Sequence, residues 1–126
     1  MEIDFSDLIG CKYGFRGRGP TVYDCYGLVL EVERRYGHCM PDYDYKESGM
    51  LASLAMQVIA SGKAKRIPAP VPGSMIMFEN ARGVNVHIGV YVGDGMFIHC
   101  TMVGGVRLER LEPRASTISG VYVWQN

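Results

Sequence analysis

Apolar positions in the first half of the chain recur at steps of three and four residues, the period of an amphipathic helix. Over residues 25–36 this pattern predicts a helix with Asp24 at the N-cap and Gly37 as the stop signal. A second stretch with the same period covers residues 48–61 and is followed by Gly62. The sequence therefore predicts two helices in the first half of the chain.

The pattern changes after the prolines at positions 68, 70 and 72, where short runs rich in β-branched and aromatic residues begin. Helices followed by antiparallel strands are typical of an α+β fold. We therefore expect N-terminal helices packed on an antiparallel sheet of about five strands, in a single domain over residues 1–126. The expected strands cover residues 74–79, 84–92, 96–101, 106–111 and 118–124.

Two of these runs alternate with a period of two and predict a β-hairpin. Their apolar residues share one face only if Val92 pairs with Met96 across a bulged three-residue turn, Gly93–Gly95, with Gly95 in the left-handed position. A two-residue turn would send the two apolar sets to opposite faces, and we reject it on that ground. In the chosen register His87 and His99 are diagonal neighbours on the other face.

Cys25 follows the expected N-cap, where unpaired backbone amides and the helix dipole favour a thiolate and lower the thiol pKa. Gly27 lies in the first turn, where glycine costs about 1 kcal/mol relative to alanine, which indicates close packing of another backbone or a ligand. Gly89 leaves room on the histidine face for another element, and we expect the start of the Cys25 helix there. The resulting line predicts Cys25 as nucleophile, His87 as base and His99 as the residue that orients it.

Each of these residues also has a plainer interpretation. A single cysteine is more often a buried structural residue than a nucleophile, and histidine on a strand is usually structural. Zinc is a competing use of Cys and His, but Cys100 neighbours His99 and points to the opposite face, so a fourth ligand is missing. We therefore expect no metal and no cofactor. His38, beside a turn, is expected only to cap the first helix.

Composition narrows the partners and the location. Thirteen basic residues balance thirteen acidic residues, so no nucleic-acid or membrane partner is expected. The first residues lack a basic region leading into an apolar stretch, and no run of about 18 apolar residues occurs. We expect no signal peptide, and synthesis in the cytoplasm. The four cysteines form no Cys-x-x-Cys pair, and disulfides are not expected.

Taken together, these motifs resemble the NlpC-type cell-wall peptidases, a papain-like family, and in particular its phage-tail branch. The segment Tyr13–Val29 is similar to the family's Tyr-x-Trp-Gly-Gly loop and Asp-Cys-Ser-Gly-Leu-Val motif. Pro72-Gly73-Ser74 resembles the Pro-Gly-Asp that opens the family's first strand, and His87–His99 resembles its paired-histidine hairpin. The chain departs from the family at Tyr26 in place of Ser, at Ser74 in place of Asp, and at Phe15-Arg16 in place of Trp-Gly.

The resemblance implies a papain-like cysteine peptidase in which Cys25 is the nucleophile, His87 the general base and His99 the third polar residue. It also implies that the Tyr13 hydroxyl lies near the oxyanion, and that Asp24 meets the free amine of the substrate.

Three further residues are expected to bind substrate. Tyr26 stands where the family's Ser often grips the stem peptide. Arg16 and Arg18 suit the carboxylates of a γ-linked glutamyl stem, because guanidinium is a planar fork; a solvated pair of loop arginines is the alternative.

The resemblance implies hydrolysis of the γ-D-glutamyl to diamino acid bond in peptidoglycan stem peptides. Segments 16–20 and 37–42 look like the versions found in phage tail-assembly proteins, so other tail proteins are expected partners and the cell wall the place of action, as part of a tail or after lysis. Two alternatives remain open. One is a structural tail component with weak catalysis, and the other is a thiol amidase or acyltransferase acting on a non-murein substrate.

Overall fold

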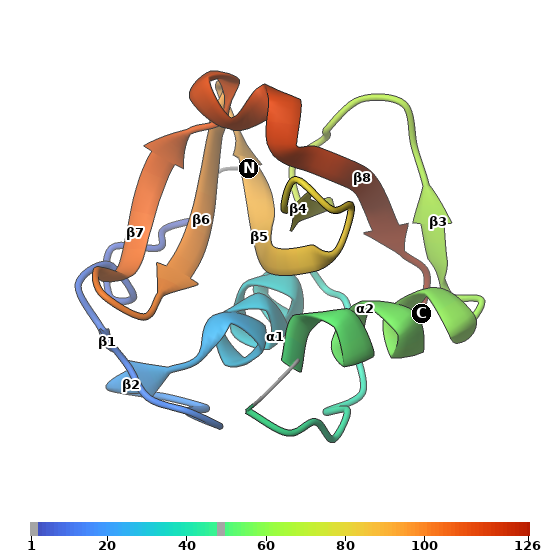
Figure 1. Cartoon of the computed structure of the whole chain (residues 1–126). Coiled ribbons are helices and arrows are strands. Elements are labelled where there is room, and N and C mark those ends of the chain that lie inside the picture. The colour runs from blue at the N-terminus through green and yellow to red at the C-terminus, as the bar shows by residue number, and fades with distance from the viewer. Residues whose placement is uncertain (1–2, 48–49) are drawn as a thin grey trace.

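Two helices pack against one face of an antiparallel sheet in the computed structural model, which describes residues 3–47 and 50–126 (Figure 1). The helices are α1 (Cys25–Arg35) and α2 (Met50–Ala60). The main sheet has the strand order β3-β8-β4-β5-β6-β7. Its strands are β3 (Ala64–Arg66), β4 (Met75–Glu79), β5 (Asn85–Gly93), β6 (Met96–Thr101), β7 (Gly105–Arg110) and β8 (Ile118–Trp124).

Helix α1 begins and ends where the sequence predicts. The Asp24 side chain accepts a hydrogen bond from the Gly27 N–H at 2.7 Å, which confirms the N-cap. At the other end Gly37 takes a φ of 87°. The His38 N–H donates to the Glu33 carbonyl, and the Gly37 N–H donates to the Arg34 carbonyl. These two bonds form a Schellman motif, so His38 closes the helix as expected.

The second helix and the edge of the sheet differ slightly from the expectation. The described part of α2 starts at Met50, and the expected start at position 48 lies outside the described residues. The sheet has one strand more than expected, because the three residues of β3 pair with β8. Those residues, Ala64–Arg66, are too few and too polar to show a strand pattern. The loop before α1 adds a short parallel pair, β1 (Lys12–Tyr13) and β2 (Val22–Tyr23).

The β5–β6 hairpin corrects the expected three-residue turn. Asp94 and Gly95 form a two-residue turn with φ angles of 54° and 74°, as a type I′ turn requires. The register then shifts by one residue at a β-bulge next to the turn. The bulge restores the register that the turn alone would lose, so the ground on which we rejected a two-residue turn was wrong. The Cα pairs are Val90–Ile98, Tyr91–Phe97 and Gly93–Met96.

The sheet separates two hydrophobic clusters. The larger lies between the sheet and the helices, and the smaller lies on the opposite face with Phe78 and Phe97. A 3-10 helix, η1 (Glu112–Thr117), connects β7 to β8 (Figure 1). The sheet residues of the larger cluster include Met75, Met77, Ile88, Val90, Ile98, Cys100 and Val106.

Candidate active site

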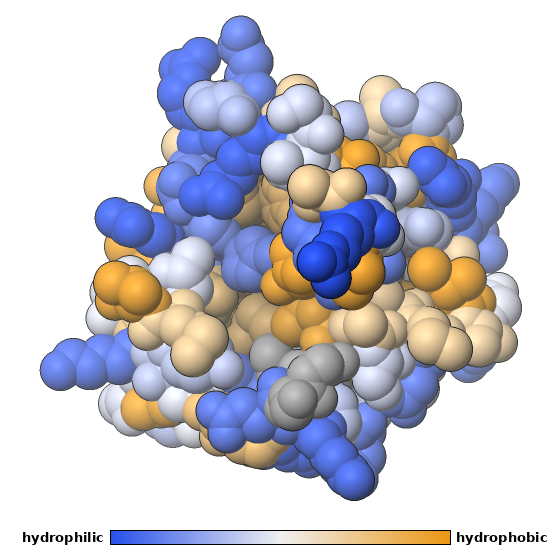
Figure 2. All heavy atoms as spheres, viewed as in Figure 1, coloured by the Kyte–Doolittle hydropathy of each residue, from blue (hydrophilic) through white to orange (hydrophobic). Residues whose placement is uncertain are grey.

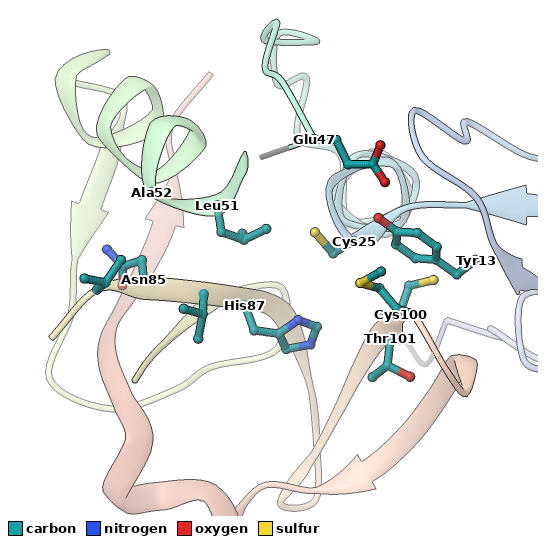
Figure 3. A pocket seen from close by; sticks show the side chains of 12 residues that line it. Tyr13, Cys25, Glu47, Leu51, Ala52, Asn85, His87, Cys100 and Thr101 are labelled. Carbon is teal, nitrogen blue, oxygen red and sulfur yellow. The ribbon is translucent and has the colours of Figure 1, made fainter. Parts of the chain in front are cut away.

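A pocket of about 550 Å³ lies where the start of α1 meets the ends of β5 and β6. Cys25, Tyr13 and His87 all line it, and Figure 3 shows the Tyr13 hydroxyl directed toward Cys25 with the His87 ring on the facing strand. Figure 2 shows hydrophobic surface gathered in the middle of the face it views, between the sheet and the helices. The apolar lining of the pocket comprises Leu51, Ala52, Val84, Val86 and Met102.

Local structure explains how the pocket residues meet. Cys25 is the first residue of α1, directly after the N-cap. Strand β1 pairs with β2 just before that helix and so brings Tyr13 beside the helix start. His87 lies near the beginning of β5, whereas the paired part of the β5–β6 hairpin begins at Val90 and runs to the turn. The two strand ends therefore flank the pocket, with Thr101 on the β6 side (Figure 3).

The two histidines are in direct contact, which confirms the predicted diagonal pair. The Nε2 atom of His87 is 2.6 Å from Nδ1 of His99, and the rings meet edge to face. The His99 side chain is fully buried, and its Nε2 is bonded to the Glu109 carboxylate of β7. Arg114 of η1 in turn donates to Glu109 at 3.3 Å. A continuous series of polar side chains thus runs from the pocket across one face of the sheet, from β5 through β6 to β7.

The histidine face is not the one that α1 covers, contrary to the expectation drawn from Gly89. A Cβ at Gly89 would come within 3.0 Å of the Phe97 ring and of the Ile98 carbonyl oxygen, so β6 itself fills that space. Helix α1 packs on the opposite face, against the larger cluster. Cys25 and His87 nevertheless line one pocket, which lies between the start of α1 and the beginning of β5.

The thiol and the imidazole are both neutral in this structure. Burial, followed by the nearby Asp24 carboxylate, raises the pKa of Cys25 to about 12, and burial and His99 lower the pKa of His87 to about 3. The backbone amides at the helix start do act to lower the thiol pKa, as predicted, but burial outweighs them. The expected net lowering is therefore wrong. No hydrogen bond joins Cys25 to His87 in the described part of the chain, and such contacts commonly tighten on substrate binding.

Glycine is used at position 27 for the reason that the sequence predicted, the close approach of another backbone. A Cβ there would lie 2.0 Å from the carbonyl oxygen of Gly17, in the loop that precedes the helix. The close approach of that backbone confirms why glycine is used inside the first turn. The loop carrying Tyr13 is thereby seated directly against α1.

Tyr13 is placed to act as a hydrogen-bond donor. Burial raises the pKa of its hydroxyl, which stays protonated at neutral pH. Because the hydroxyl points toward Cys25 (Figure 3), it lies near the place where an oxyanion would form.

Asp24 and Tyr26 lie outside the pocket, and the geometry does not support their expected contact with substrate. Both are fully buried. The Asp24 carboxylate is occupied by the Gly27 N–H, the Arg18 guanidinium and the Tyr45 hydroxyl. The Tyr26 hydroxyl donates to the Pro41 carbonyl at 2.6 Å. Both residues hold the helix start in place.

The two arginines of the loop also have partners within the chain. Arg18 donates to Asp42 at 2.8 Å and to Asp24 at 2.9 Å, and Arg16 donates to Asp44 at 3.3 Å. Neither arginine lines the pocket that holds Cys25. Their expected pairing with substrate carboxylates therefore finds no support in the geometry, because their partners are carboxylates of the segment after α1.

Glu109 is the site residue that sequence reasoning missed. Strand β7 pairs with β6 so that Phe97 faces Glu109 and His99 faces Arg107. Paired residues point to the same side of a sheet, so Glu109 is diagonal to His99. The alternation argument used for the first hairpin, extended to residues 106–111, would have found it.

Cys11, Cys25, Cys39 and Cys100 are all free thiols. Across residues 3–47 and 50–126, no group of three or more His, Cys, Asp or Glu side chains converges to hold a metal ion. No helix in the same ranges is long and apolar enough to span a bilayer.

The fold and the pocket define a class of protein: an α+β domain in which a cysteine at a helix start shares a pocket with a histidine of an antiparallel sheet. The sequence pattern of the NlpC/P60 family matches residues 10–124. The chain therefore belongs to the NlpC/P60 family, as the motifs predicted.

Curated relatives resemble the chain over most of its length. It is 31% identical over 91 residues to "Probable endopeptidase p60" of Listeria innocua, covering 72% of this chain and 17% of that protein. It is 24% identical over 103 residues to "Murein DD-endopeptidase MepS/Murein LD-carboxypeptidase" of Escherichia coli, covering 81% of this chain and 48% of that protein. The chain thus spans less than half of either relative.

Solved structures show the same fold. NlpC2 from Trichomonas vaginalis superposes with a TM-score of 0.71 at 24% identity, covering 94% of this chain and 44% of that one. The NlpC/p60 domain of the peptidoglycan hydrolase SagA gives a TM-score of 0.60 at 18% identity, covering 93% and 90%. These likenesses confirm the expected α+β fold.

Proposed function

We propose that the chain is a papain-like cysteine peptidase that hydrolyses peptidoglycan stem peptides. The observation that carries this proposal is the pocket shared by Cys25 and His87, with the far ring nitrogen of His87 held by His99. Membership of the family and relatives named for endopeptidase and murein activity support a cell-wall peptide as the substrate.

In the proposed acylation step, the Cys25 sulfur attacks the carbonyl carbon of the scissile amide while Nδ1 of His87 takes the thiol proton. The carbonyl oxygen becomes an oxyanion, to which the Tyr13 hydroxyl and the N–H groups at the start of α1 donate hydrogen bonds. His87 then gives its proton to the leaving amine as the C–N bond breaks. The product is a thioester on Cys25.

Water completes the cycle. As a water oxygen attacks the thioester carbonyl, Nδ1 of His87 takes a proton from it. The C–S bond breaks, the carboxylic acid leaves, and the proton returns to the Cys25 sulfur. The neutral thiol and neutral imidazole of the free site are thereby restored.

We assign the scissile bond to the γ-D-glutamyl to diamino acid linkage, and the place of action to the cell wall, after synthesis in the cytoplasm. Similarity of segments 16–20 and 37–42 to phage tail-assembly proteins supports a tail-associated role with other tail proteins as partners.

A structural tail component with weak catalysis is the second candidate. Two observations favour this hypothesis. Cys25 is only 3% exposed, and its raised pKa disfavours the nucleophilic thiolate.

Mass spectrometry of muropeptides distinguishes these functions. Purified peptidoglycan is incubated with the wild-type protein, with Cys25→Ala and with Cys39→Ala, whose thiol is exposed and away from the pocket. We expect soluble fragments cut at the γ-D-glutamyl bond from wild type and from Cys39→Ala, and none from Cys25→Ala. Unchanged cleavage by Cys25→Ala would rule out the proposed nucleophile. Hydrolysis of small amides with intact peptidoglycan untouched would instead indicate a thiol amidase or acyltransferase.

A further inference from the structure

The polar chain behind the pocket ends in a carboxylate that the proposed reaction does not use. Glu109 is bonded to Nε2 of His99 and to the Arg114 guanidinium. Although partial burial raises the pKa of Glu109, the bond from His99 and the charge of Arg114 bring it below its ordinary value. Glu109 is therefore ionised at neutral pH, and an ionised carboxylate can only accept hydrogen bonds.

The ionised carboxylate fixes the direction of both hydrogen bonds that connect Glu109, His99 and His87. His99 must carry its proton on Nε2, because that nitrogen faces an acceptor. Burial lowers the pKa of His99, so the ring is neutral and its Nδ1 is unprotonated. That bare nitrogen can only accept, so Nε2 of His87, 2.6 Å away, must be the donor.

The consequence falls on the atom that faces the thiol. A neutral imidazole carries one proton, and in His87 that proton is on Nε2. We propose that Glu109 is a positioning residue that sets the tautomers of His99 and His87, and so keeps Nδ1 of His87 unprotonated as the base for Cys25.

The opposite arrangement shows what Glu109 excludes. If His99 carried its proton on Nδ1, it would donate to Nε2 of His87 across the same distance. His87 would then carry its own proton on Nδ1, toward the pocket, and could not take one from Cys25. The two arrangements have the same heavy-atom geometry, so only the acceptor at the end of the chain selects between them.

The test variant is Glu109→Gln, and Arg114 determines which way its new amide is expected to turn. Its guanidinium has donors only, and it lies 3.3 and 3.4 Å from the two oxygens of Glu109. In Glu109→Gln we expect the amide oxygen to take the position nearer Arg114, away from His99, which leaves the amide NH₂ to face Nε2 of His99. That nitrogen must then accept, which reverses both tautomers.

The direct readout is the tautomer of His87, measured by nitrogen-15 NMR of the histidine rings. Wild type is expected to show His87 protonated on Nε2, and Glu109→Gln is expected to show it protonated on Nδ1. A wild-type spectrum with the His87 proton on Nδ1 overturns the proposal without any variant. Wild-type tautomers in a folded Glu109→Gln protein overturn it as well.

Activity gives the second readout and depends on the proposed function. Loss of the base should lower kcat for stem-peptide hydrolysis by about 10²–10⁴-fold with little change in KM. In the double variant Glu109→Gln/Arg114→Ala the amide is free to turn its oxygen to His99. We therefore expect the wild-type tautomers to return and part of the lost kcat to be recovered, which a merely structural role would not produce.

The matched control is Glu112→Gln, which makes the same change of charge at an exposed position of η1. It should leave the tautomers and kcat unchanged. If the wild type has no peptidase activity but Glu109→Gln reverses the tautomers, the proposed function fails and the role of Glu109 stands. If Glu109→Gln loses activity while its tautomers stay as in the wild type, the proposed role of Glu109 fails and the proposed function stands.

Discussion

Cys25 combines two opposing influences within a few ångströms. Its position at a helix start favours a thiolate, while burial and the Asp24 carboxylate favour the thiol, and the second influence prevails. Asp24 cannot be spared, because its carboxylate caps the helix and binds Arg18. The residue that caps the helix start therefore adds to the effect of burial in keeping the proposed nucleophile protonated.

Alkylation with iodoacetamide tests this protonation state. With a thiol pKa of about 12, Cys25 should be alkylated at least about tenfold more slowly than the exposed Cys39 at pH 7, because only the thiolate reacts. A raised pKa means that the thiolate fraction grows as pH rises, so the Cys25 rate should still be increasing at pH 10. Peptide mapping by mass spectrometry follows both cysteines in one sample. Labelling of Cys25 as fast as Cys39 at pH 7 would contradict the assignment.

At the scale of elements, the seat of the preceding loop on α1 depends on one missing side chain. Gly27→Ala should destabilise the protein by more than about 2 kcal/mol, although alanine is the better helix former, because the new Cβ meets a backbone oxygen of Gly17 that cannot turn away. Chemical denaturation measures the change.

The matched control for that substitution is Gly104→Ala. There the added Cβ meets side chains and no backbone, the flexible end of Arg107 at 2.8 Å and the Thr101 hydroxyl oxygen at 3.0 Å, and the φ angle is not left-handed. We expect a change within about 1 kcal/mol. Equal losses in the two variants would show that the contact with Gly17 is not the cause.

Most of the helices and strands could be predicted from the sequence, but their packing could not. Periodicity and capping signals predicted both helices, all strands from β4 to β8, and the contact between the histidines, because each depends on neighbours a few residues away. The sequence predicted a bulged turn at Gly95 but not the two-residue Asp94-Gly95 turn, since a one-residue slip and its correction at the bulge leave the alternation unchanged. The placement of α1 on the other face of the sheet depends on packing between distant segments, which no local pattern reports.

At the scale of the whole molecule, Arg18 joins three separate segments. Its guanidinium donates to Asp24 at the helix start, to Asp42 after the helix and to Tyr45 further on. The side chain is 26% exposed, so these bonds are partly shielded from water. The loop, the helix start and the 42–45 segment are thus held as one unit beside the pocket.

Arg18→Lys keeps the charge but removes the planar fork, and it should lower the free energy of unfolding by about 1–3 kcal/mol. The control is Arg34→Lys, whose ion pair with Glu31 is formed by an arginine that is 67% exposed. That change should stay within about 0.5 kcal/mol. Equal effects in thermal unfolding would show that the shielded position of Arg18 does not matter.

The prolines between β3 and β4 divide the chain into two halves of different chemistry. The nucleophile and Tyr13 come from the half before this connector, whereas His87, His99 and Glu109 come from the half after it. A nascent chain therefore lacks the complete proposed site until the strands after the connector are synthesised and packed against the helices. Completion of folding is what assembles the proposed active site, and a polypeptide cut in the connector would show the proposed hydrolysis only when both fragments reassemble.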